Sequence, residues 1–123
     1  EMNFGDWEGR TYEDLKEDGV YCGWLADWQK KQIPNGESWP IFRERVNVFL
    51  EHFLHDRAES NSNIAIITHK GVIREMVSLL TDEAEYWSVE AEFGTYYEIK
   101  LYRDNGKWFC SGHGARPDLE ERR

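Results

Sequence analysis

Residues 64–74 read IAIITHKGVIR, an apolar run that ends in a histidine and is followed by a glycine-containing turn. The β-branched run over residues 63–68 is typical of a strand that a parallel sheet buries on both faces. The apolar spacing after it predicts a helix over residues 71–80. A strand followed at once by a helix indicates an α/β fold. This order places His69 at the carboxyl edge of a sheet, where open α/β sheets bind their ligands.

His69 is the first candidate functional residue, because the helix that follows it offers an anion site. The first backbone N–H groups of a helix have no partner within it, and they lie at the positive end of its dipole. A phosphate would be well held there. The alternative is a structural histidine that is hydrogen-bonded at the end of a strand. From this segment alone, both interpretations stay open.

The rest of the chain predicts further helices and a hairpin. Thr11 is a good helix N-cap, and Ser38 is another, followed by a broad apolar face over residues 41–54. The expected elements are a short helix ending near Gly19, a second from Val20 ending near Pro34, a long helix after Ser38, and strands over residues 92–101 and 107–111 joined by a turn at 103–106.

Composition and charge exclude several classes of function. The chain has 123 residues, of which 40% are hydrophobic, and its formal net charge is −9. This length and composition predict a single globular domain over residues 1–123, and the negative charge argues against nucleic acid and anionic membrane surfaces as partners. The 2 cysteines show no metal or secreted-domain spacing, which favours a reducing cytoplasm. A homo-oligomer stays open.

Two further segments are candidates for function. Residues 1–9, EMNFGDWEG, form a glycine-punctuated loop with carboxylates beside aromatic rings. Aromatic neighbours desolvate a carboxyl and favour its protonated form, which suits a general acid. The alternative is a solvated acidic turn. Residues 34–38, PNGES, are explained equally well as a loop that caps the following helix.

Taken together, the three segments resemble the histidine phosphatase superfamily, which includes phosphoglycerate mutases. That superfamily carries E-x-x-FG-x-WEG, then P-x-GES at the start of a long helix, then THGGVIR after a strand; here they read EMNFGDWEG, PNGES and THKGVIR. Residues 1–8 and 21–38 are most similar to the α-ribazole phosphatases. The resemblance implies a three-layer α/β/α fold with a mainly parallel central sheet, of which this chain would form the C-terminal two-thirds.

The resemblance also implies roles for individual residues. Glu1 would protonate the leaving oxygen, and His69 would donate to the phosphoryl group. The backbone N–H of Lys70 and the turn at Gly71 would face the phosphate. Lys70 stands where the family usually has glycine, so its side chain would add charge or narrow the pocket.

Two residues would lie near the mouth of the substrate site. They are Glu37 and Ser38, which match the P-x-GES motif. The implied reaction is hydrolysis of a phosphomonoester through a phosphohistidine, without a metal or other cofactor. The implied substrate is small and phosphorylated, with α-ribazole 5′-phosphate of cobalamin synthesis first. Phosphoglycerate mutation and broad-specificity phosphatase activity are the alternatives within the family.

The resemblance leaves one essential group unaccounted for. The family's nucleophile is the histidine of an Arg-His-Gly motif, and that triplet does not occur in this sequence. Ser111-Gly112-His113-Gly114 imitates it only in part, because no arginine precedes His113. Without the nucleophile, covalent phosphoryl transfer is not available. The chain alone is therefore expected to be inactive, and a non-catalytic phosphate-binding or interaction module is the alternative from a different class.

Overall fold

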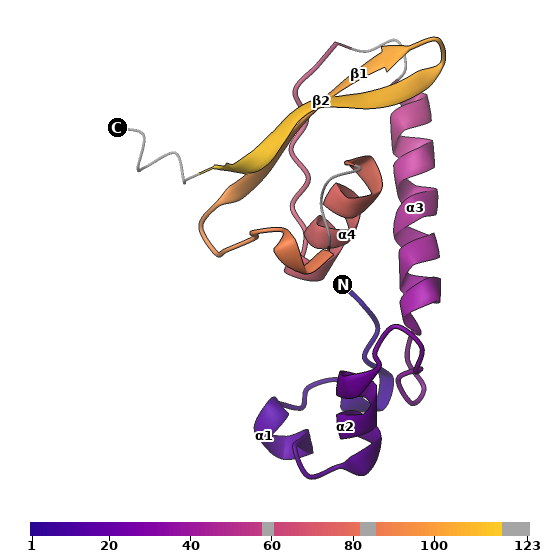
Figure 1. The fold of residues 1–123 in the computed structure, drawn as a ribbon, viewed down its shortest axis with the longest axis vertical. Helices are drawn as coiled ribbons and strands as arrows, with labels where there is room; N and C mark the ends of the chain where they lie inside the picture. The colour runs from indigo at the N-terminus through magenta and orange to yellow at the C-terminus, as the bar shows by residue number, and fades with distance from the viewer. Residues whose placement is uncertain (58–60, 82–85, 117–123) are drawn as a thin grey trace. The chain divides into compact units, whose positions relative to one another are not determined.

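The computed structural model describes residues 1–57, 61–81 and 86–116 (Figure 1). They divide into two compact units, Met2–Val46 and Glu1 with Asn47–Arg123, and each is described by itself below. The expectation of a single domain over residues 1–123 stays a prediction. The elements are η1 (Gly5–Trp7), α1 (Tyr12–Leu15), α2 (Gly19–Ala26), α3 (Trp39–Asp56), α4 (Lys70–Leu80), η2 (Tyr86–Ser88), β1 (Tyr96–Asp104) and β2 (Lys107–Arg116).

The short helices α1 and α2 begin where side chains cap them. Thr11 forms a capping box with Asp14, which confirms the predicted start of α1. The carboxylate of Asp18 accepts hydrogen bonds from the backbone N–H groups of Val20 and Tyr21, and so begins α2. Both helices end earlier than predicted, α1 at Leu15 and α2 at Ala26. The cap at Asp18 explains the first of these ends, because it starts a new helix at Gly19.

Aromatic side chains form the core of the Met2–Val46 unit. Trp7 and Ile33 are buried, and Phe4, Tyr21 and Trp24 pack against them. The ring of Trp7 lies 5.1 Å from that of Tyr21 and 5.6 Å from that of Trp24, both edge to face. Edge-to-face packing adds to the free energy gained from burying the rings. The aromatic residues of the N-terminal segment are therefore used to build this core.

Two loops, residues 3–6 and 34–37, meet in this unit and form what we call the loop junction. The backbone N–H of Asp6 donates to the carbonyl oxygen of Pro34 at 3.0 Å, and the amide of Asn35 donates to the Asp6 carboxylate at 3.0 Å. Gly5 has φ +50°, and a Cβ there would lie 2.3 Å from the Pro34 oxygen. Only glycine fits such an approach. A Cβ on Gly36 would lie 2.6 Å from the carbonyl oxygen of Asn3, so loop packing requires glycine at both Gly5 and Gly36.

The helix α3 confirms the prediction for residues after Ser38. The hydroxyl of Ser38 accepts the backbone N–H of Ile41 at 3.4 Å. Phe42, Val46 and Leu50 are buried and recur every four residues, as one face of a helix requires. Among the residues that the structure describes, no helix is both long enough and apolar enough to cross a bilayer.

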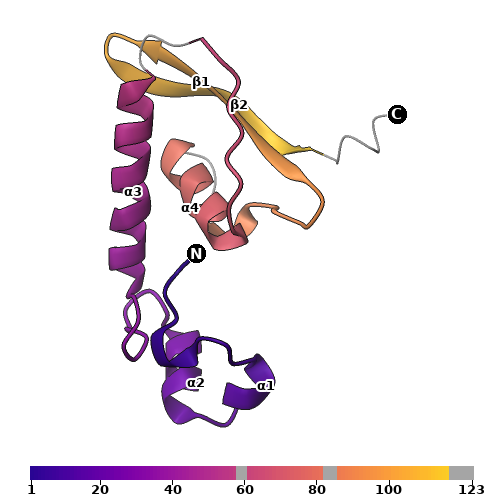
Figure 2. The ribbon, with the colours of Figure 1, turned by 180° about the vertical axis from the view of Figure 1, so that it is seen from behind.

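The segment before α4 is not the buried strand that its sequence predicts. Residues 61–69 lie in neither a helix nor a strand, and Figure 2 shows them as plain coil leading into α4. Ile64 and Ile66 are about half exposed, and Ile67 is 99% exposed. A strand needs a neighbour for its backbone hydrogen bonds. No other part of the described chain pairs with this segment, so the prediction of a strand is wrong here, whereas the helix α4 is confirmed.

The chain forms one sheet within the described residues, the antiparallel hairpin of β1 and β2. Its register runs from Tyr96 opposite Arg116 to Asp104 opposite Lys107, with an irregularity after Lys100. Asn105 and Gly106 both have positive φ in the turn, as a tight hairpin requires. The predicted hairpin is confirmed, with strands at Tyr96–Asp104 and Lys107–Arg116 instead of residues 92–101 and 107–111. The three-layer arrangement around a parallel sheet is not seen in these described residues, which contribute helices and this hairpin.

Candidate functional site

The N-terminus of α4 is the centre of the candidate site. His69 is its N-cap residue, with an extended backbone (φ −94°, ψ 156°) and no side-chain capping bond. Its carbonyl oxygen accepts the N–H of Ile73 at 3.0 Å, so the helix hydrogen bonds begin here. The N–H groups of the first turn and the helix dipole therefore face the space beside His69. This arrangement suits an anion.

Glu1 and His69 lie together in the same compact unit. Their Oε2 and Nε2 atoms are 3.5 Å apart, and the two side chains are 59% and 63% exposed. This is an open pair that a ligand can reach from solvent. The exposure also shows that aromatic rings do not cover Glu1 as its sequence neighbours suggested. The structure brings the two predicted catalytic residues together, and their roles in catalysis stay predictions.

Lys70 pairs with a carboxylate that the sequence did not single out. Its Nζ atom lies 3.2 Å from Oε1 of Glu92. Glu92 begins a turn in which the backbone N–H and the hydroxyl of Thr95 both donate to its carbonyl oxygen, at 3.4 and 2.7 Å. No residue near Glu92 in the sequence marks it as a partner of Lys70. It reaches Lys70 because residues 86–95 pack near α4.

The turn η2 supports the first half of α4. A Cβ added to Gly71 would lie 3.2 Å from the hydroxyl of Tyr86, so the helix and this ring approach closely. Arg74 donates from Nε to the carbonyl oxygen of Val89 at 3.2 Å, and its guanidinium lies 5.1 Å from the ring of Trp87. Burial raises the pKa of Tyr86, which keeps its hydroxyl protonated. These contacts hold residues 86–89 against the first half of α4, beside Gly71.

Glu37 is a structural centre of the other unit. Its carboxylate accepts two hydrogen bonds from the guanidinium of Arg45, both at 2.9 Å, and one from the backbone N–H of Asn3 at 2.7 Å. The bond from Arg45 lowers the pKa of Glu37. Its neighbour Ser38 caps α3. Both residues therefore have local structural roles, and their contact with substrate stays a prediction.

Replacing Glu37 by glutamine is expected to destabilise the protein by about 1–2 kcal/mol at pH 7, because it removes a charged acceptor from a bidentate pair. A carboxyl whose pKa is lower in the folded protein stabilises the fold above its unfolded pKa of about 4.3, and this stabilisation is lost as pH falls through the folded pKa. The difference between the two proteins should therefore shrink as the pH falls below the unfolded pKa of about 4.3. Urea titrations at several pH values measure it.

Glu13→Gln is the control for this prediction. Glu13 pairs with Lys16 at 2.6 Å, but its side chain is 72% exposed. Such a pair contributes little to stability, so the control should lose under about 0.5 kcal/mol. A cost for Glu37→Gln that is equally small, or that persists unchanged at low pH, would contradict the assigned role of the carboxylate.

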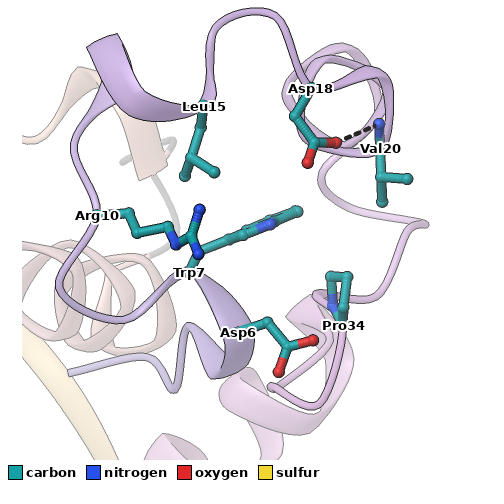
Figure 3. A pocket seen from close by; sticks show the side chains of 7 residues that line it. All are labelled: Asp6, Trp7, Arg10, Leu15, Asp18, Val20 and Pro34. Atoms are coloured by element: carbon teal, nitrogen blue, oxygen red, sulfur yellow. Dashed lines mark hydrogen bonds between the residues drawn. The ribbon is translucent and has the colours of Figure 1, made fainter.

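A pocket of about 220 Å³ lies within the Met2–Val46 unit (Figure 3). Its lining mixes apolar and charged side chains and includes none of the predicted site residues. Both of its carboxylates have structural partners, Asp6 in the loop junction and Asp18 at the start of α2. The described residues hold no cluster of three metal-ligating side chains. The lining residues are Asp6, Trp7, Arg10, Leu15, Asp18, Val20 and Pro34.

Comparison with known proteins decides the family. The sequence pattern of the histidine phosphatase superfamily (branch 1) matches residues 1–112, which include Glu1, the loop junction and the start of α4. The chain belongs to the histidine phosphatase superfamily. This membership agrees with the three motifs and accounts for their order along the chain.

Individual histidine phosphatases resemble this chain over part of their length. The adenosylcobalamin/alpha-ribazole phosphatases of Salmonella typhimurium and Escherichia coli are each 34% identical over 105 residues, which cover 82% of this chain and 51% of each relative. The crystal structure of the alpha-ribazole phosphatase from Shigella flexneri matches with a TM-score of 0.72 and 30% identity, over 96% of this chain and 58% of that one. The chain thus spans about half the length of the curated relatives.

Proposed function

We propose that the protein containing this chain hydrolyses phosphomonoesters through a phosphohistidine, and that His69 and Glu1 belong to its active site. The observation that carries the proposal is the Glu1–His69 pair, 3.5 Å apart at the N-terminus of α4. Family membership supports the same assignment. A carboxyl, an imidazole and free helix N–H groups together offer a proton donor and an anion site.

In the proposed mechanism, a histidine outside this chain's described site attacks phosphorus and takes the phosphoryl group. His69 and the N–H groups at Lys70 and Gly71 donate to the phosphoryl oxygens and spread the charge of the transition state. Glu1 donates a proton to the leaving oxygen. In the second step Glu1 accepts a proton from water as the water attacks the phosphohistidine. Phosphate leaves and the nucleophile is restored.

The proposed substrate is α-ribazole 5′-phosphate. The relatives from Salmonella typhimurium and Escherichia coli are named for this activity, and they share about a third of the aligned residues. The exposed Glu1–His69 pair can be reached by a substrate larger than phosphate itself. We place the reaction in the cytoplasm, with a small phosphorylated molecule as partner.

Phosphate release from α-ribazole 5′-phosphate tests the proposal in the purified native-length protein. The value of kcat/KM is expected to exceed that for 3-phosphoglycerate and for p-nitrophenyl phosphate, and His69→Asn should reduce it by about 10²–10³-fold. Interconversion of phosphoglycerates would identify a mutase instead. Equal rates for all three substrates would identify a broad-specificity phosphatase, and no phosphate release from any of them would overturn the proposal.

The same assay tests whether a metal takes part. His69 with Glu1 is a weak ligand set for a catalytic divalent ion, which usually has three protein ligands. Activity is therefore expected to survive incubation with EDTA. Loss of activity that a divalent ion restores would show that the site needs a metal.

A further inference from the structure

Lys70 lies beside the proposed phosphate site and is held by a weak ion pair. It is the first residue of α4 and follows His69 directly, at a Cα separation of about 3.8 Å. Its Nζ atom contacts Oε1 of Glu92 at 3.2 Å, and the two side chains are 42% and 71% exposed. An ammonium on a flexible four-carbon stem can leave such a partner and reach a neighbouring ligand.

Lys70 is the cation of α4 that is available to a ligand. The helix has one other basic residue, Arg74. That guanidinium donates to the carbonyl oxygen of Val89 and lies over the ring of Trp87, so it holds η2 in place. A phosphate that enters beside His69 would also meet the carboxylate of Glu1, which lies 3.5 Å from Nε2 of His69. A second positive charge is therefore needed there more than in a site without that carboxylate.

Glu92 is placed to compete with a phosphate for this ammonium. Its carboxylate makes a single contact with Lys70, and an ion pair this exposed contributes little. A phosphate dianion offers more charge and three acceptor oxygens, so it forms the stronger bond. The backbone of Glu92 is fixed by Thr95, which keeps the carboxylate close after it is displaced.

We infer that the Lys70 ammonium binds an oxygen of the substrate phosphate, and that Glu92 is a counterion that the phosphate must displace. This inference rests on the proposed phosphatase function. It goes beyond it by adding a substrate-binding side chain where the family usually has glycine, and a carboxylate that weakens substrate binding. Glu92 thereby sets the affinity of the site for phosphate.

Two substitutions of opposite expected effect test the inference in the native-length protein. Lys70→Gln is expected to raise both KM and the Kd for inorganic phosphate about tenfold, the effect of losing one charge-assisted hydrogen bond. Glu92→Gln is expected to lower both by about threefold, because it removes the competing charge. Titration of inorganic phosphate by calorimetry gives Kd independently of turnover.

Matched controls separate this contact from a general change of charge. Lys107→Gln and Glu90→Gln remove the same charges from exposed positions of the same unit and should leave Kd within about twofold. Lys70→Arg should restore phosphate binding if glutamine weakens it. A Kd unchanged by Lys70→Gln, a weaker affinity in Glu92→Gln, or no binding of phosphate by the unaltered protein would each overturn the inference. Absence of turnover alongside the expected Kd values would instead sink only the proposed function.

Discussion

Glu1→Gln is expected to lower kcat for α-ribazole 5′-phosphate by about 10²–10⁴-fold, the usual contribution of a positioned general acid. Glutamine keeps the size of the side chain but cannot donate a proton in the same way. The alkoxide that leaves from a sugar phosphate is a poor leaving group, so it depends on that proton. Phosphate release under saturating substrate measures the effect in the native-length protein.

The choice of leaving group makes this prediction specific to proton donation. The nitrophenolate that leaves from p-nitrophenyl phosphate is stable without a proton, so Glu1→Gln should cost far less there, about tenfold or below. Glu8→Gln is the control, because Glu8 accepts the N–H of Phe4 at 2.9 Å and belongs to the same N-terminal segment. Equal losses for both substrates would show that Glu1 acts by binding or folding rather than as an acid.

Local chemistry explains which parts of the fold could be predicted from the sequence. The helices α1, α3 and α4 begin where expected, because each start depends on residues a few positions apart. Thr11 with Asp14 is one case, and Ser38 with Ile41 is another. The hairpin follows from Asn105 and Gly106, whose positive φ values suit a tight turn. In each of these elements the residues that decide the structure are neighbours in the chain.

The strand predicted over residues 63–68 is absent because its formation depends on residues that are not its neighbours in the chain. Its apolar pattern describes a segment that can be buried in a sheet, but pairing requires a second strand from elsewhere in the chain. The described residues offer no such partner, and Ile67 is left 99% exposed. Since the chain spans about half the length of its curated relatives, the remainder of such a protein is where we expect the partner strand.

The candidate site likewise contains residues that the sequence could predict and residues that it could not. The motifs pointed to Glu1 and His69, and the structure brings these residues to 3.5 Å. Sequence reasoning missed Glu92 and Arg45, because nothing near either residue marks it as the partner of Lys70 or of Glu37. Long-range ion pairs depend on where whole segments lie. The sequence marks Gly5 only as part of a glycine-punctuated loop, whereas its close approach to the carbonyl oxygen of Pro34 is what requires glycine.

The 123 residues expressed alone are expected to show no phosphatase turnover above background, although they hold Glu1 and His69. The sequence has 4 histidines and no Arg-His-Gly triplet. His52 and His55 lie within α3, and Nδ1 of His113 is 2.6 Å from the hydroxyl of Tyr97 on the hairpin. None of these three lies in the motif that carries the family's nucleophile.

Loss of a covalent nucleophile typically costs about 10⁶-fold in kcat, so the remaining half-site can bind an anion without turning it over. Hydrolysis of p-nitrophenyl phosphate by residues 1–123 and by the native-length protein, side by side, measures the difference. Residues 63–68 should also gain amide protection in the longer protein, because a paired strand would cover the isoleucines that are exposed here. Turnover by the 123 residues that His113→Asn abolishes would place the nucleophile on the hairpin and refute the assignment of the site.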